Sequence, residues 1–251
     1  MAMNKYLVLQ GIVQAAEVVA GVPGKFLDLM DVSQMDLGFT AEEGTHTEHR
    51  SGQRLEDFTW ETKNSGTVTL GVDSHHAENI AMMFRGEVST LSGSFTAEEI
   101  AATLPAVGDI LRLPYGNLSA VVITDSSAGP KTLTAGTNYR LDADYGDLEV
   151  LNVTTGAPFV APLKAAGSYG AQTNITLMTS AQKEYWLRYK GVNPDGARVL
   201  VELYRWKPKP GEMMKLITGE VTVSSLQGKV MADNTKANDA ELGQFGRVIY
   251  L

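Results

Sequence analysis

The sequence predicts a mainly β protein, a β-sandwich or barrel with one flanking α-helix and an all-β insertion. Most of the 251 residues lie in segments that alternate apolar and polar side chains and end at Gly, Asn, Asp or Pro, which is typical of half-buried antiparallel strands. One segment clearly changes to the 3.6-residue period of an amphipathic helix. With 43% hydrophobic residues, the chain can bury a sizeable core, and wholesale disorder is excluded.

Composition excludes several functions. The formal net charge is −8, from 21 Lys and Arg against 29 Asp and Glu, whereas proteins that wrap nucleic acid need clustered cations. The absence of cysteine excludes disulfides, thiolate zinc sites and cysteine nucleophiles. The sequence contains no run of about 18 apolar residues, which a membrane-spanning helix would require. It also contains no Gly-x-Ser-x-Gly nucleophile elbow, which would point to catalysis. We therefore expect a protein that is not an enzyme, with no cofactor and no membrane partner.

Residues 55–72 are expected to form a β-hairpin, with a turn at 63–66. Successive side chains alternate between the two faces of a strand. One face, expected to lie on the core beneath the helix, carries Phe58, Trp60, Val68, Leu70 and Val72. The other face carries Asp57, Thr59, Glu61, Thr67 and Thr69.

A helix of about three turns is expected next, starting from Asp73 or Ser74 as the N-cap and ending at Gly86 as a left-handed C-terminal cap. Its core face follows the spacing of one helix side and carries Ala77, Ile80, Ala81 and Phe84. A second, shorter helix is expected from Thr96, because Thr-Ala-Glu-Glu has the reciprocal capping pattern.

The remaining sequence predicts a core domain interrupted by an insertion. Frequent Gly and Pro between short strands indicate a small all-β insertion at residues 106–178, with strands such as 118–123 and 147–151. Strongly patterned strands return at 184–189, 197–206 and 219–223. The predicted core domain therefore comprises residues 1–105 and 179–251.

Residues 40–53 contain no large apolar side chain, although they lie between segments patterned as strands. Such a stretch cannot bury itself on its own subunit. If it forms a hairpin arm of about seven residues each way, it reaches on the order of 20 Å, which is long enough to touch another subunit; a flexible loop is the alternative. The residues expected to make that contact are Glu42, Glu43, His46, Glu48, His49, Arg50 and Arg54.

Histidines and tryptophans offer two other kinds of site. His46 and His49 lie three residues apart, and His75 and His76 are adjacent, but a metal site needs further ligands and a rigid frame. We expect solvated loop histidines and no metal. The three tryptophans lie in alternating strands, where burial in a core or a subunit contact is favoured over a sugar-binding face.

Several segments resemble the tail tube proteins of long, non-contractile-tailed bacteriophages. The resemblance covers about residues 20–90 and 180–251. It rests on the early strand, the polar arm, the run Thr-Val-Thr-Leu at 67–70, the helix, the run Tyr-Lys-Gly-Val-Asn-Pro-Asp-Gly from Tyr189, and the close Leu-Gln-Gly-Lys-Val-Met-Ala-Asp at 226–233 followed by Gly-Gln-Phe-Gly at 243–246.

The resemblance implies a β-sandwich with a flanking helix that joins head-to-tail into hexameric rings, whose inner strands share one barrel. Rings then stack through the arm into a tube that conducts DNA without binding it specifically. The implied partners are copies of the chain and other tail proteins, such as the tape measure and the terminator. The implied location is the virion tail, and the host cytoplasm during assembly. The insertion is expected on the tube exterior, and the lumen is expected to be lined by Asp57, Thr59, Glu61, Thr67 and Thr69.

Two alternatives remain open at this point. The first is a glycan-binding β-sandwich module of a surface or fibre protein that uses exposed aromatic residues such as Trp186 and Tyr189. The second is a metal-dependent enzyme that uses His46, His49 and an acidic residue.

Overall fold

The computed structural model describes residues 7–50, 52–156, 158–211, 213–236 and 239–251. The fold is mainly β, with 52% of the residues in strands and 4% in helices, which confirms the predicted fold class. The chain divides into two compact units, Met1–Glu87 with Ile175–Leu251 and Val88–Asn174. No helix in the described part of the chain is long and apolar enough to cross a membrane.

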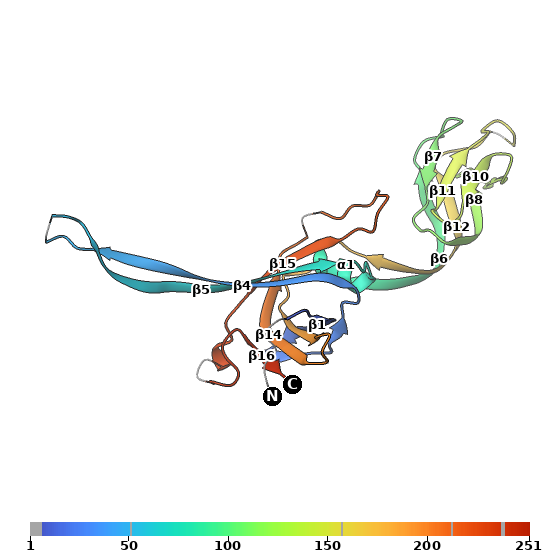
Figure 1. The fold of residues 1–251 in the computed structure, drawn as a ribbon. Coiled ribbons are helices and arrows are strands. Elements are labelled where there is room, and N and C mark those ends of the chain that lie inside the picture. The colour runs from blue at the N-terminus through green and yellow to red at the C-terminus, as the bar shows by residue number, and fades with distance from the viewer. Residues whose placement is uncertain (1–6, 51, 157, 212, 237–238) are drawn as a thin grey trace. The chain divides into compact units, whose positions relative to one another are not determined.

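A nine-stranded sheet forms most of the first unit (Figure 1). Its strand order is β2-β1-β13-β14-β15-β5-β4, while β3 pairs with β1 and β16 pairs with β14. The strands are β1 Gln10–Val19, β2 Val22–Pro23, β3 Leu27–Asp28, β4 Val32–Thr47, β5 Glu56–Val72, β13 Tyr185–Val192, β14 Arg198–Pro208, β15 Ser224–Val230 and β16 Gly246–Tyr250.

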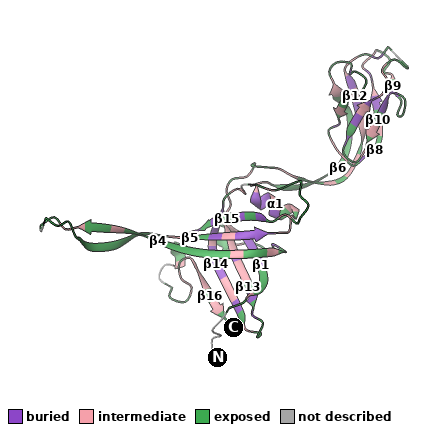
Figure 2. Cartoon of the chain, turned by 45° about the horizontal axis from the view of Figure 1, so that its top comes forward, coloured by how far each residue is buried: buried purple, intermediate pink, exposed green. Residues whose placement is uncertain are grey.

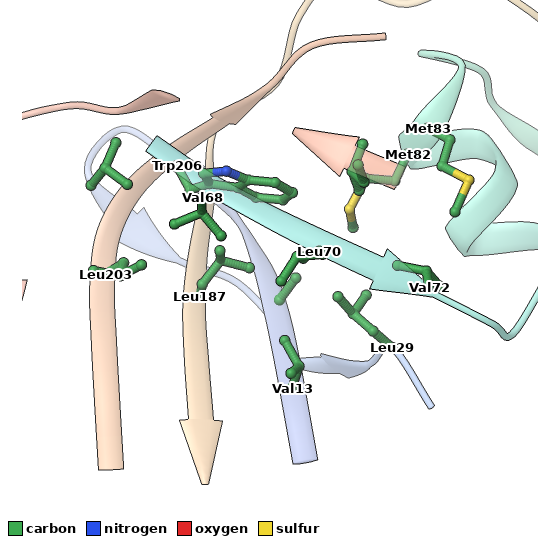
Figure 3. Packing of buried hydrophobic residues seen from close by; sticks show 13 residues of the cluster. Val13, Leu29, Val68, Leu70, Val72, Met82, Met83, Leu187, Leu203 and Trp206 are labelled. Atoms are coloured by element: carbon green, nitrogen blue, oxygen red, sulfur yellow. The ribbon is translucent and has the colours of Figure 1, made fainter. Parts of the chain in front are cut away.

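The sheet forks at β14 and folds over on itself. One side of β14 pairs with β13, whereas the other side pairs with β16 along residues 199–203 and with β15 along residues 206–208. Side chains from β1 and β13 therefore meet those from β5 and β15 in one buried cluster beside helix α1, Ala77–Met83 (Figure 3). The first unit is a β-sandwich with one flanking helix. Its buried cluster includes Val13, Leu29, Val68, Leu70, Val72, Met82, Met83, Leu187, Leu203, Trp206, Leu226 and Val230.

The expected hairpin at 55–72 is wrong, because β5 runs without a break through these residues. Residues 63–66 do not turn; they pair with β4. Val68, Leu70 and Val72 are buried, as expected, but Phe58 and Trp60 are exposed. The reason is that their part of β5 extends beyond the core.

Four other predicted strands agree with the structure. Those expected at 184–189 and 197–206 correspond to β13 and β14, and those expected at 118–123 and 147–151 correspond to β8, Leu118–Thr124, and β11, Asp147–Val150. The strand expected at 219–223 is wrong. These residues lie in the loop before β15, where Val221 and Val223 are exposed and pair with no strand.

Helix α1 is shorter than expected and buries a different face. It begins after His76, with no side-chain cap, so neither Asp73 nor Ser74 is the N-cap. Arg85, with φ 48°, takes the left-handed conformation expected of Gly86. The predicted set of core-facing residues is only partly correct, because Met82 and Met83 are the helix residues that pack into the core. Ala81 is buried, whereas Ala77, Ile80 and Phe84 are half-buried.

The second unit has a separate core and two sheets, with strand orders β10-β11-β7 and β6-β12-β8-β9. This is the all-β insertion, but it spans residues 88–174 instead of 106–178. The helix expected at Thr96 is wrong, because these residues belong to β6, which lies beside β12. The strands are β6 Val88–Ala101, β7 Ile110–Arg112, β8 Leu118–Thr124, β9 Thr132–Leu133, β10 Tyr139–Asp142, β11 Asp147–Val150 and β12 Leu163–Ile175.

Candidate functional site

A two-stranded ribbon leaves the sandwich where β15 ends. The pairing of β15 with β5 stops at Gly66, and beyond it residues 40–47 of β4 and 56–65 of β5 pair only with each other. We call these residues and the connection between them the arm (Figure 1). Eight paired residues on β4 correspond to about 26 Å at the usual rise of a strand. An arm does project from the subunit, but the prediction that residues 40–53 alone form it is wrong: residues 40–47 are one strand, and the returning strand is 56–65, which was expected in the core.

The arm has almost no support within its own chain. Its strands are almost entirely exposed (Figure 2). Of their residues, Gly44, Thr47 and Ser65 are half-buried. A two-stranded hairpin alone is at best marginally stable in water. An arm of this length therefore gains from packing against another surface.

A β-bulge at Thr62 reverses the faces of the arm. Glu42 pairs with Lys63 and Glu43 pairs with Glu61, so Thr62 is the extra residue. Its hydroxyl donates a hydrogen bond to the carbonyl of Glu42. Because residues directly opposite each other share a face, Phe58 and Trp60 lie on the same side of the ribbon as Thr67 and Thr69. The expected grouping of Phe58 and Trp60 with Val68 and Leu70 is therefore wrong.

Phe58 and Trp60 form an exposed aromatic pair on the arm. Their rings stack with centroids 5.7 Å apart, and the residues are 62% and 44% exposed. Trp60 lies across Gly44, where an added Cβ would come within 2.6 Å of the indole ring. Glycine at this position thus allows the indole to lie flat on the ribbon. We call these two residues the aromatic pair.

Several charged residues of the arm already interact within it. Lys63 Nζ lies 3.0 Å from Glu42 Oε1, and His46 Nδ1 lies 2.6 Å from Asp57 Oδ1. The backbone N–H of Arg50 donates to the carboxylate of Glu48. The carboxylates of Glu43 and Glu61 belong to directly opposite residues, a like-charge pairing that destabilises a ribbon standing alone. The remaining predicted contact residues, His49 and Arg54, lie near the tip of the arm.

The outward edge of β4 pairs with no strand in the described part of the chain. It is 16 residues long and contains neither Lys nor Pro, the residues that most often protect an edge from pairing with another chain. A cavity of about 600 Å³ opens beside it, between the two layers of the sandwich. The sandwich is thus open on this side. The apolar part of its lining comprises Leu9, Val13, Val32, Met35, Leu37, Tyr189 and Val201, and the polar part comprises Gln10, Asp31, Ser33 and Gln34.

One surface of β15, β5 and β4 is hydrophilic. The strand register places on it Gln34, Asp36, Gly38, Thr67, Thr69, Ser225, Gln227 and Lys229. We call this surface the polar face. It bears one carboxylate and one ammonium group, so its charges cancel. Of the five residues expected in a lumen, Thr67 and Thr69 lie on the polar face, whereas Asp57, Thr59 and Glu61 lie on the arm.

The sequence profile of a family described as "Protein of unknown function UCP028589" matches residues 6–249. The chain belongs to this family. No curated protein matches the chain.

The histidines of this UCP028589 protein do not gather into a metal site. The rings of His46 and His49 lie 6.0 Å apart on the arm, while His75 bonds Ser224 in the sandwich. Among the described residues, no group of three His, Asp or Glu side chains is placed to hold a metal ion.

The aromatic residues considered for glycan binding are not exposed platforms. Trp186 packs against Tyr204, with ring centroids 4.7 Å apart, and the Lys236 ammonium lies 5.4 Å over its ring. Lys236 is held by Asp233, and this ion pair, with hydrogen bonds from Thr235, lowers the pKa of Asp233 to about 2. Lys236 ends the short 3₁₀ helix η1, Asn234–Lys236. The half-buried Tyr189 lines the cavity beside β4.

Sequence reasoning missed the three features that define these surfaces: the β4 edge, the bulge at Thr62 and the aromatic pair. Alternation carries no information about which strands pair at a distance. The polar composition of residues 40–53, by contrast, indicated that an arm projects here, although not that its returning strand is 56–65.

Proposed function

We propose that this protein is a structural virion subunit that assembles with copies of itself into stacked rings, forming a tail tube through which DNA passes. The observation that carries the proposal is the unpaired edge of β4 beside an open cavity whose lining is partly apolar. A strand from a second copy satisfies both features at once, because it pairs with the edge and covers the cavity. Burial of that apolar lining supplies the driving force.

The resulting contact joins two different surfaces of the subunit. Contacts of this kind produce a ring when the rotation between neighbours closes, and closure leaves no sheet edge exposed. Six copies in a ring is the number that the resemblance to phage tail tube proteins implies. The arm then extends beyond its own ring, which suits it to contact the ring stacked on it.

The polar face suits the wall of a bore for DNA. Its hydroxyl and amide groups are hydrated, and its single Lys is balanced by a single Asp. DNA is gripped by clustered Lys and Arg that displace its counterions, whereas Lys229 is the single cation among the residues of this face; Lys209 and Lys215 lie at its border, beside Ser225 and Gln227. The net charge of −8 per subunit further disfavours adhesion of a polyanion.

Hydrogen exchange at residues 32–39 of β4 tests ring formation. These amides are expected to exchange quickly in dilute protein where they do not bond to β5, and at least about 100-fold more slowly once concentration drives assembly, because a neighbouring strand then binds them. Residues 224–230 of β15, already paired with β5, provide the internal control. If exchange at the β4 edge is the same at every concentration, the proposal is wrong.

A further inference from the structure

The loop between β14 and β15 exposes large apolar side chains. It consists of residues 209–223, of which residues 209–211 and 213–223 are described. Soluble surfaces rarely expose such side chains together unless they bind a partner. The exposed set, which includes Met213 at 72% and Ile217 at 99%, is Met213, Leu216, Ile217, Val221 and Val223.

A hollow of about 480 Å³ lies at the base of this loop. Its lining combines apolar and cationic groups and includes no carboxylate, with Lys209, Pro210, Met213, Lys215, Val223, Ser225 and Gln227. Ser225 and Gln227 also belong to the polar face, so the hollow lies where that face meets the loop. In the described part of the chain, neither Lys209 nor Lys215 lies within ion-pair distance of a carboxylate. The hollow thus suits an apolar group carried on an acidic segment.

The loop and the arm lie at opposite ends of the same sheet (Figure 1). Ser224, the first residue after the loop, pairs with Val72, whereas Val230 pairs with Gly66, where the arm begins. The seven residues between span about 20 Å, and the arm runs away from the loop. The arm of one subunit therefore cannot reach its own loop, but it can meet the loop of a second copy placed head-to-tail.

The arm has the complementary chemistry. Its aromatic pair is the largest apolar group exposed on it. Residues 40–65 carry six acidic and three basic side chains, a net charge of 3 − 6 = −3. Opposite charges steer an encounter, while buried aromatic anchors supply most of its binding energy.

We propose that the aromatic pair on the arm of one copy docks into the hollow beneath the β14–β15 loop of the next. This contact deepens the proposed function and rests on it, since it names the surfaces through which one ring stacks on another. It is directional, because each copy offers an arm at one end and a hollow at the other. A head-to-tail contact of this kind continues indefinitely and builds a tube.

Two variants and their mixture test the contact. The arm variant carries Phe58→Ser and Trp60→Ser, and the hollow variant carries Met213→Asp and Lys215→Glu; all four side chains are partly or fully exposed, so the fold is expected to persist. Sedimentation velocity should show that each variant alone needs at least about tenfold more protein than the wild type to assemble beyond single rings. The matched control, Thr45→Ala with Thr59→Ala on the opposite face of the arm, should behave as the wild type does.

Mixing the two variants gives the sharper result. The hollow variant keeps the wild-type arm, and the arm variant keeps the wild-type hollow. Equal amounts should therefore form two-layer complexes, which cannot grow further because only altered surfaces remain at their two ends. If the hollow variant assembles as readily as the wild type, the docking contact is wrong while the proposed function stands. The same holds if the loop instead binds phospholipid vesicles and leaves assembly unchanged. If the wild type itself never assembles, both proposals fail.

Discussion

Removal of the arm is expected to give a folded subunit that no longer forms tubes. The variant replaces residues 41–64 with Asn-Gly, joining Thr40 to Ser65. These two residues are directly opposite each other, with their hydroxyl oxygens 3.0 Å apart, and a two-residue Asn-Gly turn closes such a pair well. No residue of the deleted segment belongs to the buried cluster of the sandwich. The melting temperature should therefore stay within about 2 °C of the wild type.

Electron microscopy and sedimentation of this variant measure the loss of stacking. Single rings should persist, because residues 32–39 of the β4 edge remain, whereas stacks should disappear. A second variant that replaces only Gln53 with Ser at the tip keeps both strands of the arm and serves as the control. Tubes of normal length from the deletion variant would show that the arm is not the stacking element.

Alanine substitutions of Trp206 and Trp60 should have different effects, the first on the stability of the fold and the second on assembly. Trp206 is fully buried at the centre of the sandwich, and Gly228 lies so close that an added Cβ would be 2.4 Å from the indole nitrogen. Trp206→Ala should lower the free energy of unfolding by about 3–5 kcal/mol, because it leaves a large cavity. Trp60→Ala should change it by less than about 0.5 kcal/mol, since the ring is exposed on the arm, while weakening assembly.

Denaturant unfolding of dilute protein separates these effects from assembly. The comparison is matched, because both variants remove an indole from a strand of the same sheet. A loss of several kcal/mol in Trp60→Ala would mean that the arm packs on its own subunit. That result would remove the reason to expect a partner for it.

Alternation of apolar and polar residues was enough to predict the fold class, and it located the buried residues Val68, Leu70 and Val72 correctly. It failed at residues 63–66, because Lys-Asn-Ser-Gly has the composition of a turn although it pairs regularly with β4. It failed again at Thr96, where a capping pattern lies within β6. In both places, pairing with a distant strand outweighed local preference.

The projection of residues 40–47 followed from what residues 40–53 lack, since a segment without large apolar side chains has nothing to bury. The returning strand at 56–65 did not follow, because its alternation resembles that of a core strand. The sequence did not predict which side chains share a face of the arm, because the extra residue at Thr62 exchanges the two faces of β5 beyond it. The β4 edge and the hollow under the loop depend on strand order and on the fork at β14. Both arise from contacts between residues far apart in sequence, which periodicity does not encode.

Negative-stain electron microscopy of the purified chain at high concentration tests self-assembly most directly. The proposed function predicts rings, or hollow tubes of uniform width, with a central opening. Featureless single subunits at every concentration would contradict it.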